Sequence, residues 1–193
     1  MTQPLYQQLI EAAKHGDAPE VARLTKNPGE PLNWARAVRW AVHNGHLECL
    51  KILLHAQNIL DDAPDILILA ASQGHLHCVE HLLTFVDPLY NNSMAMVVAA
   101  GNGHVKCLRT LMHVCDCENH GYTALLESAQ NGHIECAQIL AEILPNDCLK
   151  QLRECFAKLD LDMTVVDQLD GYAQRTRLIH EVDGEHPHHR RKI

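Results

Sequence analysis

Aromatic residues are scarce in this chain of 193 residues, where phenylalanine, tryptophan and tyrosine together make up 4%. A large β core depends on bulky aromatic and branched side chains, so the scarcity argues against one. Hydrophobic residues still make up 47% of the chain, which is enough to form a core and argues against general disorder. Leucine and alanine are abundant among them, and this favours many small contacts between helices.

Positive charge is also in short supply. The chain has 16 lysines and arginines against 24 acidic residues, a formal charge of −8, and no long basic run precedes the last residues. Phosphate binding requires a clustered positive field, so we expect no nucleic-acid partner.

Long hydrophobic runs and a secretory signal are absent. The longest apolar runs, ILILAA (66–71) and MAMVVAA (94–100), are too short to span a bilayer. The N-terminal segment MTQPLYQQLI has neither the basic nor the apolar region of a signal peptide. Eight cysteines in such a chain indicate reduced thiols inside a cell. We therefore expect an intracellular, cytoplasmic protein with no membrane partner.

Signatures of catalysis are missing as well. The sequence contains no nucleophile elbow, Walker loop, HExxH motif or dinucleotide fingerprint. We therefore expect a protein that is not an enzyme, with no cofactor and no small-molecule substrate.

The chain does contain an internal repeat. Glycines recur at intervals of 29 residues (45−16, 74−45, 103−74 and 132−103), at Gly16, Gly45, Gly74, Gly103 and Gly132. Around four of them the local sequence is nearly the same: NGHLECL (44–50), QGHLHCV (73–79), NGHVKCL (102–108) and NGHIECA (131–137). We number the repeat units 1 to 5 by these glycines.

Apolar residues on both sides of each glycine have helical spacing. They lie three and four residues before it, and five and eight residues after it, as in Ala70, Ala71, Val79 and Leu82 around Gly74. Each unit is thus predicted to be a helix, a tight turn with glycine at positive φ, and a second helix. Helix starts are predicted at Asn33, at 61–64, at 91–93 and at Thr123. Stacked hairpins of this kind form a solenoid.

These units resemble the ankyrin repeat family. The fifth, HGYTALLESAQNGHIECAQILAE (120–142), is the most similar to the family pattern G-x-T-P-L-H-x-A-A-x-x-G-H-x-x-x-V-x-x-L-L. The resemblance covers roughly residues 5–144. The period is 29 residues here and about 33 in the family. The four missing residues fall where the family has a β-hairpin finger. The resemblance therefore implies an all-α, ankyrin-like helical-hairpin solenoid with shortened or absent β-hairpin fingers.

The register ends near residue 145. Unit 1 has Asp17 where the others have histidine, and we interpret it as an N-terminal cap. Amphipathic stretches at 146–159 and about 162–181 are interpreted as a degenerate, capping sixth unit. The prediction is a single solenoid domain over 1–181, with five units to about 145 and a helical C-terminal cap over 146–181. Residues 182–193 lack a core pattern and are predicted to be a disordered tail.

The repeated cysteines are interpreted as packing residues. Adjacent units of a helix stack lie about 8–10 Å apart, whereas a disulfide needs Cα atoms within about 7 Å. Each cysteine is therefore expected to act as a small apolar side chain that faces the next unit. The histidine after each glycine is expected to form hydrogen bonds with the turn and the neighbouring loop. The two sets are Cys49, Cys78, Cys107 and Cys136, and His46, His75, His104 and His133.

A second reading concerns HVCDCENH (113–120). His113, Cys115, Cys117 and His120 are the ligand types of a tetrahedral zinc site. Cys-x-Cys is tighter than the usual zinc spacing, and the segment coincides with an inter-unit loop. A plain loop is the preferred interpretation, and a metal-binding protein or enzyme that uses this cluster is the alternative function.

A protein partner is expected on the concave face of the solenoid, which the first helices line. The position five residues before each glycine holds Glu11, Trp40, Leu69, Val98 and Glu127, an apolar strip with acidic ends. The alternative is that loops cover these apolar residues. The full set of predicted partner-binding residues is Glu11, Arg36, Arg39, Trp40, His43, Asn44, Leu69, Gln73, Val98, Asn102, Glu127 and Asn131.

The sequence thus favours a non-enzymatic protein-binding module, an adaptor whose partner it does not identify. Another hypothesis keeps the same scaffold, as a fragment or adaptor, but its function then depends on the tail or on another chain. Finger-poor chains of this type resemble those that large viruses and intracellular bacteria carry as host-directed factors, which would place the protein in the host cytoplasm.

Overall fold

The computed structural model describes residues 3–26, 34–56 and 63–183. Within these ranges the chain forms twelve α-helices and no strand. Five helical hairpins follow one another, each formed by a first helix and a second helix. They are α1 (Leu5–His15) and α2 (Ala18–Lys26), α3 (Trp34–His43) and α4 (Leu47–Ala56), α5 (Ala63–Gln73) and α6 (Leu76–Leu82), α7 (Tyr90–Gly101) and α8 (Val105–Met112), and α9 (Cys117–Gln130) and α10 (Ile134–Ile143).

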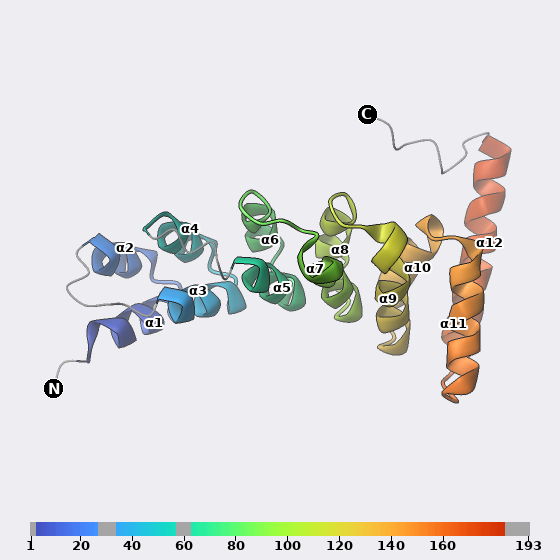
Figure 1. Ribbon diagram of the computed structural model, residues 1–193, viewed down its shortest axis with the longest axis horizontal. Coiled ribbons are helices and arrows are strands. Elements are labelled where there is room, and N and C mark those ends of the chain that lie inside the picture. Colours follow the sequence, from blue (N-terminus) through green and yellow to red (C-terminus); the bar gives the residue numbers. More distant parts are fainter. Residues whose placement is uncertain (1–2, 27–33, 57–62, 184–193) are drawn as a thin grey trace.

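The hairpins stack side by side in two layers (Figure 1). Each first helix packs against the next first helix, and each second helix against the next second helix. The apolar positions five and eight residues after each glycine are buried between neighbours, as Val79 and Leu82 are in unit 3. The predicted all-α solenoid is therefore confirmed.

Each hairpin turns at its glycine. All five turn glycines have φ between 73° and 76°, a left-handed conformation that side chains with a Cβ adopt only at a cost. In unit 3 the amide of His75 donates to the carbonyl of Ala70, which closes the end of α5. The glycine spacing in the sequence therefore marks the turns correctly.

The connections between units are short. Residues 83–89 join α6 to α7, residues 113–116 join α8 to α9, and residues 144–145 join α10 to α11, all without a strand. The other two connections, 27–33 and 57–62, lie outside the described residues. Where the structure describes these connections, the predicted shortening of the fingers is confirmed.

Two first helices begin earlier than predicted. Helix α9 begins at Cys117 rather than after Thr123, because Asp116 serves as its N-cap and accepts a 3.1 Å hydrogen bond from the amide of Asn119. The predicted loop at 113–120 is therefore wrong from Cys117 onward. Helix α7 begins at Tyr90, ahead of the predicted start at 91–93, and Ser93 within it has a φ of 56°.

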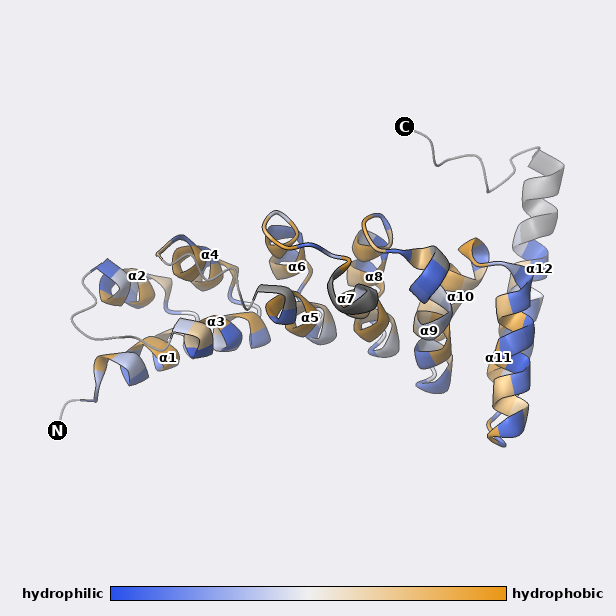
Figure 2. Ribbon diagram, viewed as in Figure 1, coloured by the Kyte–Doolittle hydropathy of each residue, from blue (hydrophilic) through white to orange (hydrophobic). Residues whose placement is uncertain are grey.

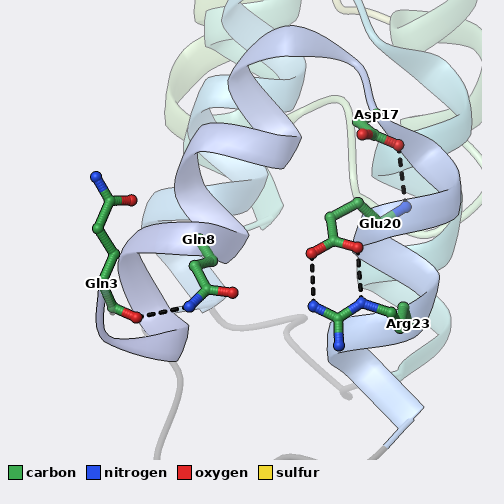
Figure 3. Close-up of polar contacts among 5 residues, drawn as sticks. All are labelled: Gln3, Gln8, Asp17, Glu20 and Arg23. Atoms are coloured by element: carbon green, nitrogen blue, oxygen red, sulfur yellow. Dashed lines mark hydrogen bonds and ion pairs between the residues drawn. The ribbon is translucent and has the colours of Figure 1, made fainter. Parts of the chain in front are cut away.

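Unit 1 differs from the others at its turn. Asp17 replaces the histidine, and its carboxylate accepts a 3.0 Å hydrogen bond from the amide of Glu20 in the first turn of α2 (Figure 3). Arg23 binds both oxygens of the Glu20 carboxylate. The aspartate thus caps the second helix at the position that a histidine holds in the other units.

Two longer helices follow unit 5. They are α11 (Asn146–Lys158) and α12 (Thr164–Asp183), and Asp160 adopts a positive φ of 54° in the turn between them. Helix α12 packs against α10 and α11. Arg153 of α11 pairs with the carboxylates of Asp167 and Asp170 on α12. Helix α12 extends two residues past the predicted end at 181, and the rest of the predicted tail, 184–193, lies outside the described residues.

Candidate interaction surface on the first helices

The layer of first helices presents one residue per unit at the position five residues before the turn glycine. We call Glu11, Trp40, Leu69, Val98 and Glu127 the first-helix strip. The two glutamates are exposed, and the three apolar residues are half-buried, with one side packed against the core. The strip therefore keeps apolar surface accessible at its centre and carboxylates at its ends.

Trp40 contacts charged and aromatic side chains from both α1 and α3. The Lys14 ammonium lies 5.5 Å from the centroid of its ring, within the range of a cation–π interaction. The His43 ring meets the indole edge-on at a centroid distance of 5.6 Å. Glu11 pairs with Lys14 at 3.6 Å and with His15 at 3.2 Å. Helices α1 and α3 thus build an aromatic surface with both charge signs beside it.

The remaining predicted residues of α3 also lie at the surface. Arg36, Arg39 and His43 are exposed, and Arg39 directly precedes Trp40 in the sequence. Their charged and polar groups can therefore reach a partner that is seated on the indole.

The predicted turn residues have a second role that the sequence did not reveal. The amides of Asn44, Asn102 and Asn131 each donate a hydrogen bond to a backbone carbonyl of the preceding unit, at 2.8, 3.1 and 2.8 Å. Gln73 occupies the same position in unit 3, and its amide contacts the neighbouring Ser72 hydroxyl at 3.5 Å instead. The three asparagines thus join neighbouring units, although all four residues remain exposed.

The repeated histidines make a parallel set of bonds. Nε2 of His46, His75 and His104 lies 2.9–3.0 Å from a carbonyl oxygen of the preceding unit's turn, namely Lys14, His43 and Ser72. The backbone carbonyl oxygens of Lys14 and Ser72 therefore each accept hydrogen bonds from both an asparagine and a histidine side chain. We call these asparagine and histidine bonds to the preceding turn the turn network. For His46, His75 and His104 it confirms that the histidines bind a neighbouring loop, and shows that the loop belongs to the unit before.

Each turn glycine except the last also touches a histidine ring of the next unit. A Cβ at Gly74 would lie 2.5 Å from Nδ1 of His104, and at Gly16, Gly45 and Gly103 the corresponding distance is 2.6 Å. At Gly132 a Cβ would meet nothing within 4 Å. Four of the five glycines are thus required by packing as well as by backbone conformation.

The repeated cysteines are buried, with at most 1% of their surface exposed, and are free thiols. Burial, with a smaller effect of neighbouring Cys107, raises the pKa of Cys78 to about 11. Burial, followed by the neighbouring Glu135 carboxylate, raises the pKa of Cys136 to about 11. A reactive thiolate requires a lowered pKa and an accessible sulfur, so these residues serve packing, as predicted.

The cluster at 113–120 does not gather as a metal site. Cys115 and Cys117 are buried: Cys115 Sγ donates to the Pro88 carbonyl and Cys117 Sγ contacts the Met96 sulfur. His113 is exposed, and His120 lies in the first turn of α9. Across the described part of the chain, no group of three or more histidine, cysteine or acidic side chains is arranged to hold a metal ion.

We therefore expect the purified protein to contain no stoichiometric zinc, because the two thiols point into the core rather than toward the histidines. Elemental mass spectrometry of protein prepared without chelator measures this directly. One equivalent of zinc that disappears in Cys117→Ala but persists in Cys155→Ala, a thiol outside the cluster, would contradict the expectation.

Among the described residues, no helix combines the length and apolarity needed to cross a bilayer.

Comparison with known proteins identifies a family. A family model described as ankyrin repeats (3 copies) matches residues 9–89 and again residues 67–151. No curated protein matches the chain in sequence. The two matches together cover most of the chain, including all five turn glycines, and they agree with the stacked helical hairpins of the structure. The chain therefore belongs to the ankyrin repeat family.

Proposed function

We propose that this chain is a non-enzymatic adaptor that holds a partner protein on its first-helix strip. Ankyrin repeats are generally protein–protein interaction modules. The observation that carries the proposal is that Trp40, Leu69 and Val98 keep apolar surface accessible on three successive units. Large side chains that recur at an accessible position form a continuous contact surface, and tryptophan is enriched among residues that dominate binding energy.

The charges around the strip suggest what the partner presents. Glu11 and Glu127 suit a lysine or arginine at either end of a bound segment, and the central residues suit apolar anchors. Arg36 and Arg39 lie one helical turn or less from Trp40 and suit an acidic group of the partner.

Trp40→Ala and Leu69→Asp are the test of this surface. We expect each variant to capture less partner from cell lysates than the unchanged chain, because each removes an apolar contact from the centre of the strip. Thermal unfolding should change little, because both side chains are only half-buried. Arg23→Ala, on a second helix of unit 1, is the matched control and should capture as the unchanged chain does. A large loss of stability in both strip variants would show that Trp40 and Leu69 are core residues and would contradict the proposal.

We also propose that the solenoid is one domain over 1–181, in which α11 and α12 cover the end of unit 5 as a degenerate sixth unit. Support comes from apolar residues of both helices, including Leu152, Phe156 and Val166, which join the same hydrophobic core as units 1 to 5. The test is deletion of 146–193, which should expose the apolar surface of α10 and lower the unfolding temperature.

The cellular setting belongs to the same proposal. The shortened fingers resemble those of host-directed factors of large viruses and intracellular bacteria, and on that analogy the partner is a host protein in the cytoplasm. Captures from several cell types, compared by quantitative mass spectrometry with Trp40→Ala as the reference, test this. Partners found only among proteins of the chain's own source would contradict it.

A further inference from the structure

A second row of apolar side chains runs along the edge of the solenoid where the second helices end. Phe85, Val114 and Ile143 lie eleven residues after Gly74, Gly103 and Gly132, and are 51%, 43% and 40% exposed. We call these three residues the edge row. They hold the same position of the 29-residue repeat in successive stacked units, so we expect them to follow one edge of the stack. Figure 2 shows hydrophobic residues on the turns that follow α6 and α8.

The fold does not require this row. Five and eight residues after each glycine, the second helices already bury their apolar side chains completely, as at Leu108 and Leu111. Unit 2 has only Ala56 at the position of the row, and that alanine is exposed. Large apolar side chains that repeat at an accessible position indicate an interaction surface rather than folding.

The shortened connections leave the edge row accessible, and one of them places a further apolar side chain beside it. Cys115 Sγ donates to the Pro88 carbonyl at 3.5 Å, which brings the connection before α7 beside the one before α9. Leu89 follows Pro88 directly and is 51% exposed. A fourth large apolar side chain therefore stands next to the segment that carries Val114.

The charged residues that neighbour the edge row in the sequence are acidic. Asp87, Asp116 and Glu142 lie within three residues of its members, whereas no lysine or arginine does. His81 packs edge-on against Phe85 at 5.2 Å. Burial, and then the nearby Lys51 ammonium, lower the pKa of His81. A second copy of this chain would bring carboxylates against carboxylates, which disfavours self-association through this edge.

We infer that the edge row binds an extended, basic segment of a partner protein that carries an apolar side chain at every third residue. Neighbouring units of a helix stack are about 8–10 Å apart. An extended chain in the polyproline II conformation advances about 3.1 Å per residue with three residues per turn, so every third side chain faces the same side. Three residues of such a chain therefore span one unit. Lysines and arginines between the apolar residues face the carboxylates of the edge.

A designed peptide tests this surface on the full chain. The probe is fluorescently labelled LKRLKRL, with LEELEEL as its acidic counterpart, and binding is measured by anisotropy. We expect the combined variant Phe85→Ser, Val114→Ser and Ile143→Ser to bind LKRLKRL at least about tenfold more weakly, because three apolar contacts are lost. The matched control is Leu159→Ser with Leu161→Ser, two exposed apolar residues in the turn after α11, and its affinity should be unchanged.

Further variants separate this surface from the first-helix strip and from general charge attraction. Trp40→Ala should bind LKRLKRL normally, so a failure of the proposed function leaves this inference standing. Asp87→Lys should weaken binding of the same probe. The inference is overturned if the edge-row variant retains full affinity, or if LEELEEL binds as tightly as LKRLKRL.

Discussion

Gly74→Ala is expected to lower the free energy of unfolding by about 3 kcal/mol, which combines the strain of a side chain at positive φ with the cost of overpacking. The new Cβ would lie 2.5 Å from Nδ1 of His104. The histidine ring must then move, and its 2.9 Å bond to the Ser72 carbonyl is lost. Chemical denaturation followed by circular dichroism measures the change.

Gly132→Ala is the matched control for this experiment. Its φ of 74° equals that of Gly74, but a Cβ there meets nothing within 4 Å. Only the backbone strain remains, so we expect a loss of about 1 kcal/mol. In a His104→Ala background the cost of Gly74→Ala should fall to a similar value, because the ring that the Cβ meets is gone. Equal effects of Gly74→Ala and Gly132→Ala would show that the histidine contact carries no energy.

The second large effect is a loss of stability at alkaline pH that depends on the repeated cysteines. The folded-state pKa values of Cys78 and Cys136 are raised from an ordinary value near 9 to about 11. Each thiol contributes its full stabilisation below pH 9, and this stabilisation is lost as pH rises toward 11. The loss occurs because the same cysteine ionises at a lower pH in the unfolded chain than in the folded one. Between pH 8 and pH 10 this amounts to about 1 kcal/mol per thiol.

The combined variant Cys78→Ala and Cys136→Ala should therefore lose less stability between pH 8 and pH 10 than the unchanged chain, by roughly 2–3 kcal/mol. Tyrosines and lysines titrate in the same window, so the measured quantity is the difference between the two proteins. Val79→Ala removes buried volume beside Cys78 without removing a thiol, and should lower stability equally at both pH values. An unchanged slope in the cysteine variant would mean that its thiols titrate alike in the folded and unfolded chains.

The stacked hairpins could be predicted from the sequence because each rests on short-range patterns. Helical spacing around Gly74 involves residues at most eight positions away, and a turn at positive φ favours glycine wherever it occurs. The start of α9 was missed because Thr123 resembles the family's helix start, whereas Asp116, seven residues earlier, provides the cap in this chain.

The turn network could not be predicted in the same way, because its partners are 30 to 32 residues apart. The repeated Asn-Gly-His marked a turn, but which carbonyl each side chain reaches depends on how closely the units stack. The accessibility of Trp40 likewise depends on how α1 and α3 pack and on the place of Lys14. The identity of a partner cannot be predicted, because a binding surface constrains the chemistry of a ligand but does not identify which protein carries it.

The direction of the turn network has a consequence for synthesis. Its side-chain donors always lie in the later unit and their acceptors in the earlier one. A chain that leaves the ribosome N-terminus first therefore presents the Lys14 carbonyl before Asn44 and His46 exist to bind it. Each turn therefore gains its side-chain hydrogen bonds only after the following repeat has been synthesised.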